Sequence, residues 1–140
     1  MTEGETSHLA SELRTVLGQL MRRLRVENRL PIGQASVIAR LDREGPTWIS
    51  DLAAADRVRP QSMAQTVGEL EAQGFVTRRP DPLDGRRTMI ELTEEGRAVL
   101  EADRALREGW LARAISQGLS GADQRTLQDA VDVLRRLAEL

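Results

Sequence analysis

The chain has 140 residues, a formal net charge of −2, no cysteine, one histidine and only three aromatic side chains of the Trp, Phe and Tyr types. This length fits one domain, or a small domain with helical extensions, and its core must be built mainly from aliphatic side chains. The absence of cysteine excludes disulfides, thiolate zinc sites and thiol-based redox sensing, and a lone histidine excludes a histidine-rich metal site, so no cofactor is expected.

The first 44 residues predict two helices after a polar, frayed start at residues 1–5. Apolar side chains repeat at helical spacing between Ser7 and Arg29, and Pro31 marks the end of this helix. A second helix is predicted over residues 32–44, where it stops at Gly45. The apolar stripe of the first helix consists of Leu9, Leu13, Val16, Leu17, Leu20 and Leu24.

A short strand at 47–49 and a short helix follow. The strand places Trp48 near the base of a sheet. Ser50 is a residue type that caps helices, so we expect its side chain to accept a hydrogen bond from the first free backbone N–H groups. Leu52, Ala53 and Val58 are expected to form the buried side of this helix and of the tight turn after it.

The next helix is predicted to begin at about Arg59 and to stop at Gly74. Met63, Val67 and Leu70 recur at helical spacing and form its buried face. The polar side chains off this face are either a solvated surface or the contacts of a recognition helix with DNA bases. These side chains are Arg59, Gln61, Ser62 and Gln65.

A β-hairpin is predicted next, with strands at 75–77 and 88–92 joined by the segment PDPLDGRR. Its prolines, among them Pro80, and its Asp-Gly pair are turn formers. Asp84 and Arg86 would therefore lie with Arg87 at the tip or distal edge of the hairpin. An Asp84–Arg86 pair there is a local turn salt bridge, and the arginines can also reach phosphates or a minor groove.

Two closing helices complete the chain. Thr93 is a good cap for a long helix that ends at Gly118, and Ser120 is a cap for the last helix. The last helix carries an apolar stripe that the preceding helices and the β-hairpin alone cannot cover. This stripe consists of Leu127, Val131, Leu134 and Leu137.

Three short motifs follow one another along the chain, beginning in the helix that stops at Gly74: LExxGFVxR at 70–78, DGR at 84–86 and LTxxG at 92–96. In these motifs and in their mutual spacing the sequence resembles the MarR family of bacterial transcription regulators. The resemblance implies a mostly α fold with a small β-wing, in which a winged helix-turn-helix core at 31–92 is flanked by dimerisation helices at 1–30 and 93–140.

The same resemblance implies a homodimer that binds double-stranded DNA at a pseudo-palindromic operator, as a repressor released by a small aromatic or anionic effector. In the family pattern Asp84 restrains Arg86 for minor-groove entry. On the helix that begins near Arg59, the side chains of Gln61 and Gln65 are suited to adenine edges and that of Arg59 to a guanine or a phosphate. The sequence assigns no effector pocket. Trp48 is expected to pack in the core or in the dimer interface, and the alternative is that it lines such a pocket.

Two further observations bear on function. Between Arg57 and Arg87, six arginines against four carboxylates leave a net charge of +2, in a chain whose total charge is −2. No enzyme motif is present, and neither a signal-peptide pattern nor a long apolar run occurs, so we expect a cytoplasmic protein that is not an enzyme. The alternative function is a winged-helix protein-interaction module without specific DNA binding.

Overall fold

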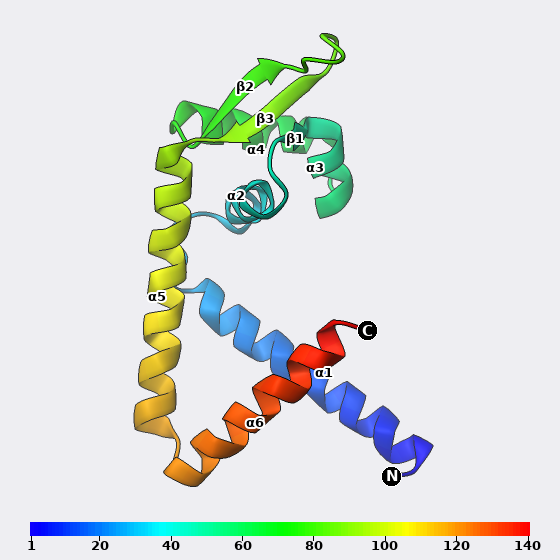
Figure 1. Ribbon diagram of the computed structural model, residues 1–140, viewed down its shortest axis with the longest axis vertical. Coiled ribbons are helices and arrows are strands. Elements are labelled where there is room, and N and C mark those ends of the chain that lie inside the picture. The colour runs from blue at the N-terminus through cyan, green and yellow to red at the C-terminus, as the bar shows by residue number, and fades with distance from the viewer.

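The computed structural model describes all 140 residues, which form six helices and one three-stranded antiparallel sheet (Figure 1). The elements are α1 (Glu3–Arg25), α2 (Ile32–Glu44), β1 (Thr47–Trp48), α3 (Ile49–Asp56), α4 (Pro60–Ala72), β2 (Val76–Pro80), β3 (Thr88–Leu92), α5 (Glu94–Gly118) and α6 (Gly121–Ala138). The sheet and α2–α4 form a winged lobe, from which α5 runs to the opposite end, where α1 and α6 lie. The mostly helical fold with a small wing confirms the sequence prediction. None of the helices combines the length and apolar character needed to cross a membrane.

In the sheet, β3 lies between β1 and β2, so that Ile90 is opposite both Thr47 and Arg78. The hairpin was predicted correctly, but β2 continues to Pro80, beyond the predicted end at Thr77. Proline is tolerated there because β2 is an edge strand, where a missing N–H interrupts no central ladder. The wing is therefore longer than the sequence pattern indicated.

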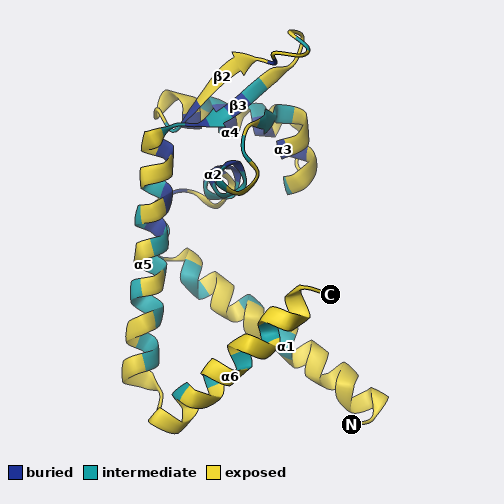
Figure 2. Cartoon of the chain, viewed as in Figure 1, coloured by how far each residue is buried: buried dark blue, intermediate teal, exposed yellow.

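The apolar core lies in the winged lobe and the first half of α5 (Figure 2). It consists of Leu30, Val37, Ile38, Leu41, Leu52, Ala53, Met63, Val67, Leu70, Val76, Ile90, Leu92 and Leu100. Neither α1 nor α6 contains a buried residue, and their apolar stripes face solvent in the single chain. Leu9 is 51% exposed and Val131 is 45% exposed.

Polar contacts connect α5 to the elements on both sides of it. The Arg104 guanidinium lies 3.2 Å from the Asp42 carboxylate of α2. Near the end of α1, the backbone N–H of Arg29 donates to Asp103 at 3.0 Å, and the Arg23 guanidinium stacks 4.1 Å from the Trp110 ring centroid. These contacts attach the otherwise exposed helix α1 to the body of the protein.

The helix ends show which local signals predict structure correctly. Thr93 and Ser120 cap α5 and α6 as predicted, each accepting a hydrogen bond from the backbone N–H three residues on, at 3.0 and 3.1 Å. The prediction that residues 1–5 are frayed is wrong, because Thr2 and Glu5 form a capping box with hydrogen bonds of 2.6 and 3.2 Å, and α1 begins at Glu3. That helix ends at Arg25, four residues before the predicted end.

The region around α3 differs from the prediction in two respects. Ser50 caps nothing, because α3 starts directly after Trp48, which is still paired with Met89 in the sheet. Val58, expected to be buried, is 42% exposed. Arg57 just before it has the left-handed φ of 54°, and this turn directs Val58 outward.

Gly96 provides a test of the close packing between α5 and the wing. A Cβ at this position would collide with the carbonyl oxygen of Phe75 and lie 2.6 Å from Cδ1 of Leu92. We expect Gly96→Ala to lower the free energy of unfolding by about 1–3 kcal/mol or more, as overpacking does. Urea denaturation would measure this change. Gly33→Ala in α2 is the control, since no atom lies within 4 Å of its added Cβ. Equal stability of the two variants would contradict the packing argument.

Candidate nucleic-acid interface

Helix α4 has one face in the core and one face in solvent. Met63, Val67 and Leu70 are no more than 2% exposed and pack in the apolar core. Side chains around a helix point in different directions, so the opposite face can contact a partner without disturbing that packing. The predicted partner-facing side chains Gln61, Ser62 and Gln65 are all exposed, and Arg59 lies exposed at the N-cap.

The turn before α4 adds positive charge to this face. Arg57 and Arg59 are exposed, and Pro60 occupies the first position of the helix. The Arg59 side chain makes no capping hydrogen bond, so its guanidinium remains available for a phosphate or a base edge. The structure therefore brings together the four residues that the sequence placed on one helix.

A hydrogen-bonded group that the sequence did not reveal lies behind Gln65. The Gln65 amide N–H donates to Oε1 of Glu69 at 3.4 Å, and the Gln34 amide N–H donates to Oε2 of Glu69 at 2.9 Å. Gln73 donates in turn to the Gln34 side-chain oxygen at 3.1 Å. Gln34 lies 35 positions before Glu69, so no local pattern could indicate that the two side chains meet.

The wing tip exposes one arginine almost completely. The Arg86 side chain is 96% exposed, and its Nε lies 3.8 Å from the Asp84 carboxylate. The same carboxylate accepts a hydrogen bond from the backbone N–H of Arg86 at 3.1 Å. Asp84 thus shapes the turn of the wing, and the Arg86 guanidinium projects freely from it.

Arg87 has a different environment, at the point where the wing loop joins β3. Its guanidinium lies 4.1 Å from the centroid of the Trp48 ring, in a cation–π contact. The Trp48 indole N–H donates to the Asp81 carboxylate at 2.6 Å, and the other oxygen of Asp81 accepts from the backbone N–H of Leu83 at 2.8 Å. Sequence reasoning treated the segment around Asp81 as a turn and missed this anchoring role.

Two further arginines on β2 connect the wing with its surroundings. Arg78 lies 3.3 Å from the carboxylate of Glu71 on α4, and Arg79 lies 3.3 Å from Glu91 on β3. The pair between Arg78 and Glu71 shows that the wing and α4 are adjacent. Both arginines belong to the six between Arg57 and Arg87, and each is paired here with a glutamate.

Comparison with known proteins identifies this arrangement. The model of the MarR family matches residues 30–88. An uncharacterized HTH-type transcriptional regulator from Mycobacterium bovis is 33% identical over 136 residues, which cover 95% of this chain and 94% of that protein. The chain belongs to the MarR family. As in the MarR family generally, its function is DNA-binding regulation of transcription, and the family is not one of enzymes.

Solved structures agree with this assignment. A transcriptional regulator from Pseudomonas aeruginosa is 37% identical, with a TM-score of 0.83 over 100% of this chain and 99% of that one. A MarR family protein from Bacillus stearothermophilus shares the fold at 20% identity, with a TM-score of 0.74 over 100% of this chain and 99% of that one. The MarR fold thus extends over the whole chain, including the helices outside residues 30–88.

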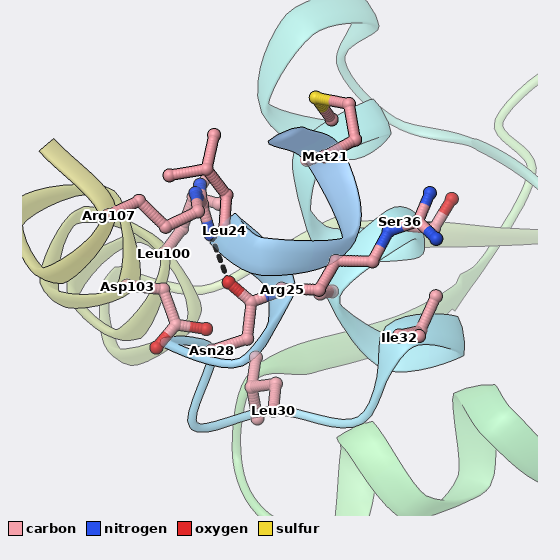
Figure 3. Close-up of a pocket in the computed structure, with 12 residues that line it drawn as sticks. Met21, Leu24, Arg25, Asn28, Leu30, Ile32, Ser36, Leu100, Asp103 and Arg107 are labelled. Carbon is pink, nitrogen blue, oxygen red and sulfur yellow. Dashed lines mark hydrogen bonds between the residues drawn. The ribbon is translucent and has the colours of Figure 1, made fainter. Parts of the chain in front are cut away.

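This MarR-family chain also contains a pocket of about 320 Å³ where α1, α2 and α5 meet (Figure 3). Arg107 donates there to the Asn28 side chain. Asp103 is 1% exposed, and its Oδ2 has no hydrogen-bond partner. Trp48 does not line this pocket, and its indole N–H donates instead to Asp81 beside the wing loop. No group of three or more His, Cys, Asp and Glu side chains is placed to hold a metal ion.

Asp81 is one of the few buried acidic residues. The backbone N–H of Leu83 is the main cause that lowers the pKa of Asp81 from its ordinary value of 3.8. The Trp48 N–H and the Arg87 charge act in the same direction, and together these influences outweigh burial, which raises the pKa. The ionised carboxylate is therefore the form that holds the wing loop against Trp48.

This pKa shift predicts the pH range in which Asp81 stabilises the fold. Because the folded-state pKa lies below 3.8, the stabilisation is complete at neutral pH and is lost as the pH falls through the folded-state value. We expect Asp81→Asn to be less stable than wild type at pH 7 and the difference to shrink in acid. Urea unfolding at several pH values would measure both, with the exposed Asp51→Asn as control. A constant difference across the acid range would contradict this assignment.

Proposed function

We propose that two copies of this chain bind a pseudo-palindromic operator and repress transcription. The two α4 helices would enter successive major grooves, roughly 34 Å apart. The observation that carries the proposal is the exposed polar face of α4 beside a wing that ends in the free side chain of Arg86. A dimer bound over a promoter would block polymerase, which is why repression is the proposed direction.

The exposed residues divide by chemistry into base and backbone contacts. Gln61 and Gln65 carry amides that match the donor and acceptor of an adenine edge, and Arg59 matches a guanine edge or a phosphate. Ser62 supplies a short hydroxyl for either base type. At the wing, Arg86 is free to enter a minor groove.

The remaining wing residues have supporting roles in the proposal. Asp84 holds the turn that presents Arg86, through its hydrogen bond with the Arg86 backbone. Arg87 keeps about half of its side chain exposed while it stacks on Trp48, so it can add a phosphate contact beside Arg86.

A homodimer formed through the terminal helices is part of this proposal. No residue in the apolar stripes of α1 and α6 is fully buried within the single chain, and a second copy is the economical way to remove these stripes from water. This supports the division into dimerisation segments at 1–30 and 93–140 and a DNA-binding core at 31–92. Dimerisation also places two recognition helices at a fixed separation.

We further propose that the pocket between α1, α2 and α5 binds a small effector that releases the operator. Its volume of about 320 Å³ is within the range of small-molecule sites. Leu30, Ile32 and Leu100 offer apolar contacts, and Arg25 offers a positive charge to an anionic group. A donor group on the ligand could satisfy the unpartnered oxygen of the buried Asp103.

The central experiment selects DNA from a random library with the purified protein and then measures affinity over a range of salt concentrations. We expect a palindromic operator, two protomers per operator by sedimentation, and a steep loss of affinity with salt, because phosphate contacts release counterions. Binding without a preferred palindrome and without salt dependence would instead favour a winged-helix module that docks on a protein.

Arg86→Ala tests the wing. Removing a cation that neutralises a phosphate should weaken operator and scrambled DNA together. It should also lower the slope of log affinity against log salt by roughly 0.9 for each phosphate that a subunit no longer neutralises. Titrations at several salt concentrations would measure the slope. Arg113→Ala, an exposed arginine on α5 outside the wing, is the matched control. Unchanged affinity of the Arg86 variant for both DNAs would refute the wing contact.

The effector site is tested with a panel of aromatic carboxylic acids. A ligand of the pocket should raise the melting temperature and weaken operator binding, since it stabilises the form to which it binds. Arg25→Ala should reduce both effects, and Arg22→Ala, on the same helix but outside the pocket lining, should leave them intact. Equal responses of both variants to an active compound would place its binding site elsewhere.

A further inference from the structure

A chain of side-chain hydrogen bonds leads from the interior of the winged lobe to the exposed face of α4. Gln34 on α2 is 7% exposed and donates to Oε2 of Glu69 at 2.9 Å. Glu69 is exposed, and its Oε1 accepts from the Gln65 amide one helical turn earlier at 3.4 Å. Glu69 therefore links a fixed, buried side chain to one that is proposed to contact a base.

The chemistry of these groups fixes their orientation. An ionised carboxylate accepts hydrogen bonds and donates none, so both amides must turn their NH₂ groups toward Glu69. The oxygen of Gln34 then faces away from Glu69, where it accepts from Gln73 at 3.1 Å. Gln73 is itself held by a hydrogen bond to the Glu69 backbone oxygen at 3.1 Å. Every amide in the group has only one arrangement that satisfies its neighbours.

This orientation limits what Gln65 can recognise. One N–H of its amide is used by Glu69, which leaves one N–H and the side-chain oxygen for a base. In the major groove adenine offers an acceptor at N7 and a donor at N6, whereas guanine offers two acceptors, N7 and O6. The remaining donor and acceptor of Gln65 complement adenine, and Glu69 withholds the second donor that a guanine edge would require.

We propose that Glu69, anchored from behind by Gln34, is a positioning residue that makes Gln65 select adenine over guanine. This inference rests on the proposed function, in which Gln65 faces a base. The positioning role also explains why a carboxylate, that of Glu69, lies on a surface that would contact phosphates. The negative charge lowers general attraction to DNA, and in return it orients the amide that reads the sequence.

Glu69→Gln gives the sharpest test because it changes the donor pattern without changing the size of the side chain. The oxygen of the new amide would accept from Gln34, so its NH₂ group would face Gln65. The Gln65 amide would then reverse and present both of its N–H donors to the base. We expect the preference at one base pair to shift from adenine toward guanine, and affinity for non-specific DNA to rise with the removal of negative charge.

The other variants remove the orientation without reversing it. Glu69→Ala and Gln34→Leu should both relax the adenine preference at the base pair where Gln65→Ala relaxes it, by up to the roughly 5- to 150-fold that one good base contact provides. Gln34→Leu changes neither charge nor the exposed surface, so its salt dependence should match that of wild type. Ser36→Ala is the control, since Ser36 is on the same helix but donates to Asp56 instead.

The measurement is the affinity of each variant for the selected operator and for every single-base-pair substitution of it, with circular dichroism to verify folding. If Gln65→Ala changes no base preference, the proposed contact of Gln65 is refuted. If Gln65→Ala relaxes one base pair but the Glu69 variants leave that preference unchanged, the positioning role is refuted while the contact stands. Since Glu69 is exposed, its variants remain informative even where Gln34→Leu fails to fold.

Discussion

The burial of one face of α4 is the constraint on which the rest of the structure depends. Met63, Val67 and Leu70 lie against the buried residues of α2, α3 and the sheet, and they fix the rotation of α4 about its own axis. A helix turned by one residue position would bury Thr66 and Glu69 in place of Val67 and Leu70, at the cost of both core packing and the polar surface. The same apolar contacts therefore determine stability and the choice of residues offered to DNA.

The core ends at Leu100, and this limit divides the molecule into parts with different needs. The winged lobe satisfies its apolar side chains internally. Helix α6 has no buried residue, and α1 is held to α5 by a few contacts such as that between Arg23 and Trp110. With so few aromatic residues, the chain has few large apolar side chains with which to enlarge its own core. Further stabilisation would come from burying the apolar stripes of α1 and α6 between two copies.

Local signals predicted much of this fold, whereas two contacts at the candidate site that they missed are long-range. Helical and strand periodicity located the α2 helix and the hairpin, and Thr93 and Ser120 marked helix starts, because these features depend on neighbouring residues. The Trp48–Asp81 and Gln34–Glu69 contacts join residues 33 and 35 positions apart. Only the folded chain shows that an ordinary turn aspartate anchors the wing.

Helix α2 connects the proposed effector pocket with the proposed DNA-contacting face of α4. Ile32 and Ser36 line the pocket, while Gln34, between them in sequence, points to the other side and holds Glu69. A packed helix moves as a rigid body, so a ligand that displaced α2 would carry Gln34 with it and alter its 2.9 Å hydrogen bond to Glu69. Coupling by this route needs no change in the core of α4. It would act on the orientation of Gln65, and thus on sequence preference, before it acted on the position of the recognition helix.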